Sequence, residues 1–172
     1  MEQVDVAILV VRLWLGIVMI AHGINHGRTL EGTAKWFASK GFKAAPMNAR
    51  VSAASEILIG LALIAGLLTS AAVVGVVATM FVAFWSIHRF AGFFNFRRPD
   101  EGYEYVATLA VVSAAVAVIG PGAYSLDSLL GIADDLDGWV GAAAVAAGLV
   151  IGAGQIATFW RRPIGTRQDQ SE

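Results

Sequence analysis

Residues 51–68 read VSAASEILIGLALIAGLL, an apolar run interrupted by a single carboxylate, that of Glu56. A helix of this length approaches the span of the hydrocarbon core of a bilayer at 1.5 Å per residue. An ionised side chain inside a bilayer costs about 2.5–3.5 kcal/mol on insertion scales, so it usually faces the protein interior and has a polar partner there. The stretch therefore predicts a membrane-spanning helix that buries Glu56 against other helices.

The composition of the whole chain also indicates a membrane protein. Of its 172 residues, 57% are hydrophobic and 15% are charged, whereas soluble domains carry about 25% charged residues. Its mean hydropathy is +0.67. The chain has no cysteine, which excludes disulfides, thiolate catalysis and cysteine-ligated metal centres. No basic face stands apart from the membrane-flanking loops, so we expect no nucleic-acid binding.

Five apolar segments are long enough to be considered as membrane spans, since about 17–25 residues cross the hydrocarbon. The first carries Glu2 and Asp5 where a cleavable signal peptide needs basic residues, so we expect it to be retained as a span. We therefore predict an all-α integral membrane helical bundle that contacts the lipid bilayer. The expected spans are residues 4–21, 51–68, 71–87, 103–119 and 139–160.

Basic residues are strongly segregated along the chain. If the five segments cross in turn, residues 22–50, 88–102 and 161–172 lie on one side of the membrane, and they contain 11 of the 12 Lys and Arg residues. The loops on the other side contain none, and the remaining one, Arg12, lies inside the first span. By the positive-inside rule we expect the N-terminus outside the cell and the C-terminus in the cytoplasm.

The first basic loop carries signals for a short helix. Residues 33–43 read TAKWFASKGFK, in which Thr33 is a candidate N-cap and Gly41 a candidate helix end. Trp36 and Phe37 give this helix an apolar side beside its lysines. This combination predicts a helix that lies in the membrane interface.

The polar residues of the spans are expected to meet near one depth. Side chains on a helix lean toward its N-terminus, so His22 and His88 lean into the membrane from the cytoplasmic ends of their spans. Glu56 and Glu104 begin spans that run the other way, and they lean toward the cytoplasm. We therefore predict a polar cluster of these four side chains just below the cytoplasmic surface, with His26 one turn beyond His22.

Each member of this cluster also has a simpler structural interpretation. Glu56 is also compatible with a polar clamp between helices, and His88 with a cap on the free carbonyl groups of its helix. Glu104 lies in a first helical turn, where a carboxylate is favoured in any case. His22 and His26 have the four-residue spacing that can share a ligand or a metal ion, but histidines at helix ends near headgroups are common, and we assign no metal.

The outer loop is expected to pair with the first span. After the break at residues 120–122, Ser125 or Asp127 is a candidate cap for a short amphipathic helix. Arg12 leans toward this face of the membrane, away from Glu56. We therefore predict a structural ion pair between Arg12 and Asp127 that locks the fold.

The last span carries a stripe of small residues at four-residue spacing, which is typical of close helix–helix contact. The contact is expected either inside the bundle or between two copies of the chain. The stripe consists of Ala144, Gly148 and Gly152.

With these residues in place, the chain resembles the DoxX family of small bacterial membrane proteins over residues 8–127. The resemblance implies a four-span core, which we place at 1–127. It also implies a location in the bacterial plasma membrane. The outer loop and fifth span at 128–160, and the polar cytoplasmic tail at 161–172, are predicted from hydropathy and charge, and the fifth span is a departure from the family core that the resemblance does not explain. The matching motifs are Arg12-Leu13, Gly16, His22-Gly23, the WFASKGF segment, Glu56, Gly60, Gly66, His88, Gly92-Phe93, Tyr103-Glu104-Tyr105 and GPGAYSLD.

The resemblance also implies a link to redox chemistry. Members of the family are similar to the membrane component of thiosulfate:quinone oxidoreductase, and actinobacterial relatives are linked to an assembly with superoxide dismutase and a sulfurtransferase. Carried onto this chain, the polar positions of the family are again Arg12, His22, Glu56, His88 and Glu104.

We therefore expect an accessory or anchor subunit of a redox assembly, with a pocket at His22, Glu56 and His88 that accepts a quinone headgroup. Histidine beside a carboxylate supplies hydrogen-bond donors and a proton relay, and we expect Trp85 and Phe93 to line the ring. The chain has no cysteine, haem signature or flavin motif, so electrons would come from a soluble or membrane redox partner. The alternatives are a stand-alone quinone-reducing subunit and a small-solute carrier, although the absence of an internal duplication argues against the carrier.

Overall fold

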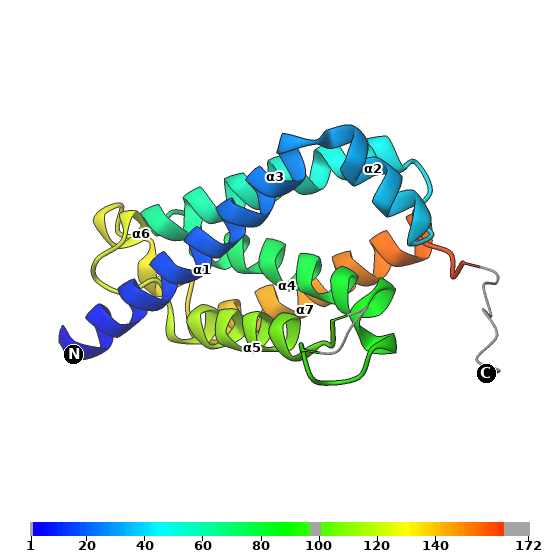
Figure 1. The fold of residues 1–172 in the computed structure, drawn as a ribbon. Coiled ribbons are helices and arrows are strands. Elements are labelled where there is room, and N and C mark those ends of the chain that lie inside the picture. Colours follow the sequence, from blue (N-terminus) through cyan, green and yellow to red (C-terminus); the bar gives the residue numbers. More distant parts are fainter. Residues whose placement is uncertain (1, 97–100, 164–172) are drawn as a thin grey trace.

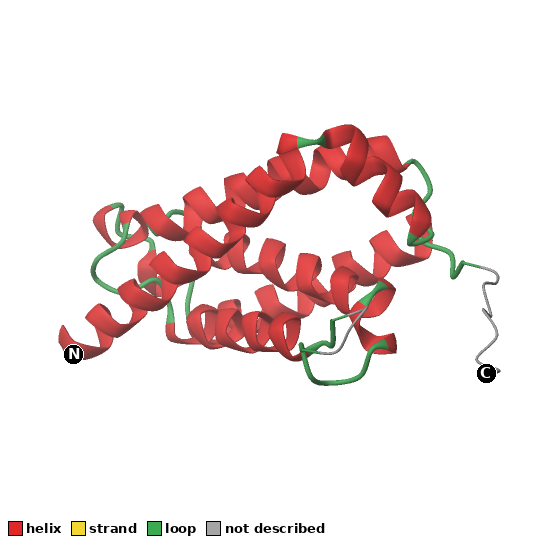
Figure 2. Cartoon of the chain, in the orientation of Figure 1, coloured by secondary structure: helices red, strands yellow, loops and turns green. Residues whose placement is uncertain are grey.

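The computed structural model describes residues 2–96 and 101–163. In these ranges the chain is helical, apart from loops and one isolated backbone bridge between Phe42 and Trp160 (Figure 2). The elements, in chain order, are α1 (Glu2–Arg28), α2 (Leu30–Ser39), α3 (Ala45–Ala65), α4 (Thr69–Ser86), η1 (His88–Phe90), α5 (Glu104–Ile119), α6 (Leu126–Leu129), η2 (Ala133–Asp135) and α7 (Gly138–Phe159).

The predicted all-α membrane bundle is confirmed. Within the described residues, α1, α3, α4 and α7 are long and apolar enough to cross a membrane. Each of the five predicted spans overlaps one long helix, but α5 has only 16 residues. It rises about 24 Å at 1.5 Å per residue, short of the roughly 30 Å hydrocarbon core. A complete crossing by residues 103–119 therefore stays a prediction.

The long helices run alongside one another, and their connections gather at two ends (Figure 1). We call these the α6 end, which holds the N-terminus and the α3–α4 turn, and the α2 end, where α1 and α4 finish. Residues 161–163 also lie at the α2 end. Apart from Arg12, the basic residues that the structure describes belong to segments at the α2 end. Arg97, Arg98 and Arg167 lie outside the described residues, and the side of the membrane that each end faces stays a prediction.

Helices α1 and α3 approach closely because glycines line their contact. A Cβ atom at Gly16 would lie 2.7 Å from the carbonyl oxygen of Gly60, and one at Gly23 would lie 2.8 Å from that of Ala53. Real Cβ atoms do not come this close, so neither position leaves room for a larger side chain. The contact at Gly23 brings the last turns of α1 against the turn of α3 that precedes Glu56.

The small-residue stripe of the last span packs inside the bundle. Gly148 and Gly152 are buried in α7, where Cβ atoms would lie 2.9 Å from the carbonyl oxygen of Val74 and 3.0 Å from that of Ala78. Both neighbours belong to α4. Since α4 already covers this part of the stripe, these two glycines are not free to contact a second copy of the chain.

The interfacial helix begins one turn earlier than Thr33, so the predicted N-cap is wrong. Helix α2 starts at Leu30, and the Thr33 hydroxyl donates to the backbone carbonyl oxygen of His26 at 3.0 Å. The last carbonyl groups of α1 have no partner within their own helix, and Thr33 satisfies one of them. The end of the helix agrees with the sequence: α2 stops at Ser39, and Gly41 follows with a φ of +94°.

The apolar core lies between the two ends of the bundle. It contains fully buried side chains such as Leu15, Leu63 and Val76. Toward the α2 end, the core residues Met19, Met80, Val106 and Leu109 also line a cavity. The core therefore closes the cavity on its inner side, and the helix ends surround its open side.

Candidate functional site

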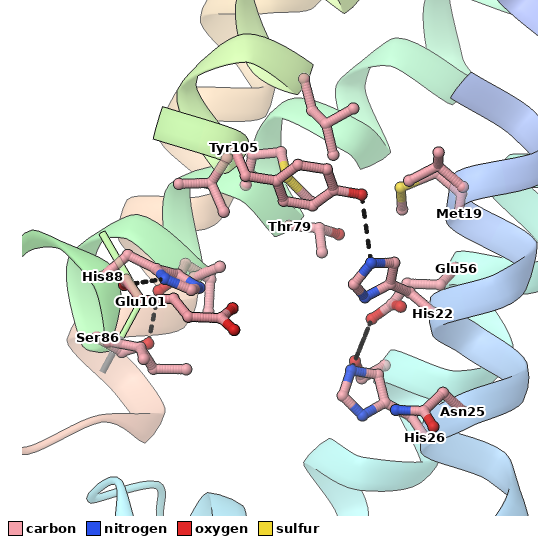
Figure 3. Close-up of a pocket in the computed structure, with 18 of the residues that line it drawn as sticks. Met19, His22, Asn25, His26, Glu56, Thr79, Ser86, His88, Glu101 and Tyr105 are labelled. Atoms are coloured by element: carbon pink, nitrogen blue, oxygen red, sulfur yellow. Dashed lines mark hydrogen bonds and ion pairs between the residues drawn. The ribbon is translucent and has the colours of Figure 1, made fainter. Parts of the chain in front are cut away.

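A cavity of about 510 Å³ occupies the α2 end of the bundle. Its volume falls within the range of roughly 300–1,000 Å³ that is typical of small-molecule sites. Side chains from α1, α2 and α3 form one wall. Side chains from α4 and α5, together with Ile87, His88, Asn95 and Glu101, form the opposite wall (Figure 3). Its polar lining includes His22, Asn25, His26, Ser52, Glu56, Thr79, Ser86, His88, Asn95, Glu101 and Tyr105.

Glu56 is the buried carboxylate of this cavity. Its side chain belongs to α3 and is only 3% exposed. The hydroxyl of Ser52, one turn earlier on the same helix, donates a hydrogen bond to Glu56 Oε1. His26 Nε2 lies 3.8 Å from the same oxygen, which is within ion-pair range but longer than a hydrogen bond. The carboxylate therefore faces protein groups, as its place in an apolar span requires.

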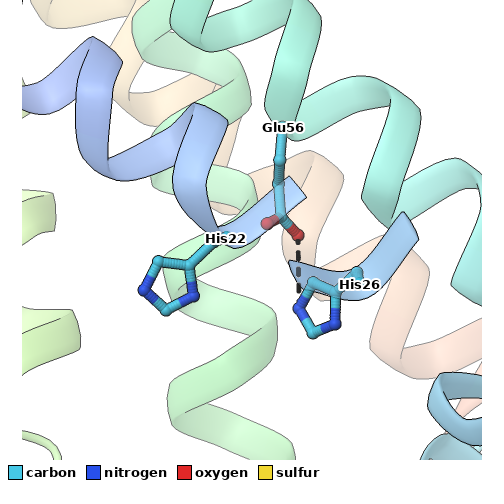
Figure 4. A group of neighbouring side chains, drawn as sticks. All are labelled: His22, His26 and Glu56. Atoms are coloured by element: carbon cyan, nitrogen blue, oxygen red, sulfur yellow. Dashed lines mark ion pairs between the residues drawn. The ribbon is translucent and has the colours of Figure 1, made fainter. Parts of the chain in front are cut away.

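Helix α1 supplies both imidazoles of the near wall. It continues as a helix to Arg28, so His22 and His26 lie four residues apart on one face. Together with Glu56 they offer three ligand atoms that all lie within 4.8 Å of one another. Figure 4 shows the carboxylate of Glu56 reaching down from α3 to the two rings.

Aromatic side chains of α2 hold His26 in place. The rings of His26 and Trp36 are stacked with centroids 6.4 Å apart, and Phe37 meets His26 edge-on at 5.8 Å. Both aromatic residues also line the cavity. The helix predicted to lie in the membrane interface therefore contributes part of the site as well.

Tyr105 bridges the two walls. Its hydroxyl lies 3.3 Å from His22 Nε2, and the two rings are stacked with centroids 5.9 Å apart. Tyr105 belongs to α5, whereas His22 belongs to α1. This contact fixes one nitrogen of His22, so the other nitrogen is directed to the Glu56 side of the ring (Figures 3 and 4).

His88 contributes an imidazole from the far wall. It lies in η1, just after α4 ends at Ser86. Its Nδ1 is 2.8 Å from the backbone carbonyl oxygen of Glu101. A carbonyl oxygen can only accept, so Nδ1 carries a proton, and Nε2 is the nitrogen that can meet a ligand.

Three residues predicted for the pocket do not line it. Glu104 accepts a hydrogen bond from the backbone N–H of Asn95 at 3.3 Å. Trp85 stacks on Phe81 and lies under the guanidinium of Arg89, 4.0 Å from its ring centroid.

Phe93, the third, packs edge-on against Tyr103 and is 48% exposed. The prediction that Trp85 and Phe93 line a ligand ring is therefore wrong for this cavity. Other aromatic residues take that position: Trp36, Phe37, Phe42 and Tyr105.

Arg12 and Asp127 are both fully buried at the α6 end, but they do not form the predicted direct ion pair. The Arg12 guanidinium donates to the carbonyl oxygens of Leu63, at 3.4 Å, and Tyr124. Asp127 accepts hydrogen bonds from the backbone of Leu68 at 2.7 Å and from other groups of the α3–α4 turn. Arg12 therefore binds the C-terminal end of α3, and Asp127 binds the N-terminal end of α4. The helix dipole favours a positive charge at the first of these ends and a negative charge at the second.

Sequence reasoning missed several residues of the cavity. Ser52 was detectable, because four-residue spacing on a helix places its hydroxyl beside Glu56. Tyr105 directly follows Glu104 in the sequence, and it is Tyr105, not the predicted Glu104, whose side chain lines the cavity. Asn25 and Glu101 carried no signal, because neither occupies a position that helical spacing or hydropathy distinguishes.

Fold and site together define a multi-pass membrane protein with a buried carboxylate between imidazoles in an open cavity. The family model described as DoxX matches residues 7–89, and this match supports membership of the chain in the DoxX family. The matched stretch runs from α1 into η1 and includes His22, His26 and Glu56. Extension of the resemblance to Asp127 stays a prediction. No curated protein and no solved structure matches the chain.

Proposed function

We propose that this protein is a membrane accessory subunit of a redox assembly and that its cavity binds the headgroup of a quinone. The observation that best supports quinone binding is the cavity, which presents imidazoles on opposite walls of an otherwise largely apolar space. A quinone ring has an apolar face and carbonyl oxygens at opposite edges. Apolar walls with a few convergent polar groups are the usual way to bind such a ligand.

The polar groups match the needs of a quinone carbonyl. The pair of His22 and Tyr105 offers donors at the α1–α5 side. His88 offers Nε2 at the other side, because its Nδ1 is held by the carbonyl of Glu101. Quinone reduction takes up protons together with electrons, and Glu56 beside His26 supports a proton relay to this space.

The redox role rests on the family and on the composition of the chain. DoxX proteins are often linked to redox or stress functions. The chain has no cysteine, and its sequence carries no haem or flavin motif, so a partner protein would deliver electrons to the headgroup. This division of labour favours an accessory subunit over a stand-alone enzyme.

Organic extraction of the purified protein tests the proposal. We expect a quinone in the extract of the wild-type protein and its loss in Glu56→Gln and in His88→Ala. Glu31→Gln is the matched control, because Glu31 is exposed in α2 and pairs with Lys35, one turn later, at 2.7 Å. Such exposed pairs contribute little to stability, so this variant should retain the quinone.

Two results would contradict the proposal. One is a wild-type extract without quinone, even after incubation with a short-chain quinone. The other is equal retention of the quinone by the wild-type protein and both cavity variants.

A further inference from the structure

We propose that His22, His26 and Glu56 bind one divalent transition-metal ion of the zinc or iron(II) class. The inference goes beyond the proposed headgroup site and does not depend on it. The ion would lie on the wall formed by α1 and α3, opposite His88. It would leave at least one coordination position directed into the cavity.

The separations of the three ligand atoms fit one ion. They all lie within 4.8 Å of one another, and His26 Nε2 and Glu56 Oε1 are 3.8 Å apart. Around an ion with ligand distances of about 2.0–2.1 Å, neighbouring tetrahedral ligands are about 3.4 Å apart. Small side-chain rotations are therefore enough to close the site, with no movement of the backbone.

The chemistry of the donor set supports the same class of ion. Two imidazoles and one carboxylate are the protein ligands of open zinc sites and of the facial triad of non-haem iron(II). Both histidines come from one helix at four-residue spacing, and the carboxylate comes from the neighbouring helix (Figure 4). The close approach at Gly23 fixes the distance between these helices.

Surrounding residues orient the ligands in the way that metal sites require. Ser52 donates to one oxygen of Glu56, and the Tyr105 hydroxyl contacts Nε2 of His22. Trp36 and Phe37 restrict the ring of His26. Outer groups of this kind set the tautomer and the ring direction of ligating histidines.

Burial gives the ion a further role. Glu56 is almost completely buried within an apolar helix, and its nearest imidazole lies beyond hydrogen-bond length. A bound cation would compensate the carboxylate more fully than an imidazole at 3.8 Å, because charges inside a membrane require close partners.

Titration of the purified full-length protein with Co²⁺ tests the proposal, after removal of any histidine tag and of bound metal. We expect one equivalent to bind, with the visible absorption of four- or five-coordinate cobalt, and Zn²⁺ to displace it. His26→Ala and Glu56→Gln should each raise the dissociation constant by at least about 100-fold, since loss of an outer-shell group alone costs 10–100-fold.

His88→Ala is the matched control, because His88 is the third histidine of the chain and lies in the same cavity but outside the cluster. It should bind Co²⁺ like the wild-type protein, although we expect it to lose the quinone. Thermal unfolding without metal shows whether each variant is folded, and His26→Gln replaces any variant that is not. Absence of saturable Co²⁺ binding, or binding that survives in both cluster variants, would overturn the metal proposal and leave the headgroup proposal standing.

Discussion

The two buried carboxylates among the described residues have different surroundings. Asp127 accepts hydrogen bonds from the backbone of Leu68 and from the backbone and hydroxyl of Thr69, at 2.7–2.9 Å. Its acceptor capacity is largely used by the fold. Glu56 accepts from one hydroxyl, that of Ser52, and otherwise faces an imidazole at 3.8 Å in a cavity. Glu56 is therefore the carboxylate with lone pairs left for a ligand, whereas Asp127 is structural.

This contrast predicts a large loss of stability for Asp127→Ala. The change leaves the N–H groups of Leu68 and Thr69 without their acceptor at the start of α4, where Thr69 is buried and the hydrogen bond from Leu68 is partly buried. We expect a loss of about 3 kcal/mol, since each buried unsatisfied donor costs about 1–3 kcal/mol, measured as a lower melting temperature in detergent. Asp134→Ala, an exposed acid nearby in sequence, should leave it unchanged. Equal melting temperatures for the two variants would refute the structural role of Asp127.

At the scale of elements, the site depends on how closely α1 and α3 approach. Gly16 and Gly60 meet at one crossing point, and Gly23 meets Ala53 closer to the cavity. These contacts hold the face with His22 and His26 against the turn with Glu56. Helix α7 contributes differently, because its buried glycines pack on the helices of the far wall, Gly148 and Gly152 on α4 and Gly141 on α5.

Gly23→Ala should therefore damage the site through the helix contact alone. The added methyl group would lie 2.8 Å from the carbonyl oxygen of Ala53, and overpacking of this kind typically costs about 1–3 kcal/mol. We expect a lower melting temperature and weaker Co²⁺ binding, as α1 moves away from α3. Gly154→Ala is the matched control, because nothing lies within 4 Å of its Cβ position. Unaltered metal binding in Gly23→Ala would show that the helix distance does not set the site.

Sequence patterns predicted the elements better than their ends and connections. Apolar runs gave the five long helices, because hydropathy and length follow directly from the demands of a bilayer. The rule that helical side chains lean toward the N-terminus predicted that His22 and Glu56 approach each other, and both line one cavity. The same argument failed for Glu104, whose carboxylate accepts from the backbone of Asn95 instead. Trp85, which was expected to line the ligand ring, stacks on Phe81 and lies under Arg89.

At the scale of the whole molecule, the two ends of the bundle have different tasks. At the α6 end, the buried side chains of Arg12, Asp127 and Thr69 tie the ends of α3 and α4 together through hydrogen bonds. The α2 end carries the cavity and the basic segments. A rigid end opposite an open one allows ligand entry without loss of the helix packing that holds the site.

The charge distribution predicts on which side of the membrane the cavity opens. By the positive-inside rule we expect the α2 end to face the cytoplasm, and a chain without cysteine allows this to be tested with single substitutions. Lys35→Cys in α2 and Glu101→Cys before α5 should be protected from a membrane-impermeant maleimide in intact cells, whereas Asp134→Cys at the α6 end should react. All three positions are exposed in the structure, so protection reports the membrane and not burial.

Because Glu101 and Asp134 flank α5, opposite outcomes for these two also require α5 to cross the bilayer despite its 16 residues. Equal labelling of the two would instead place both ends of α5 on one side and remove the fifth crossing.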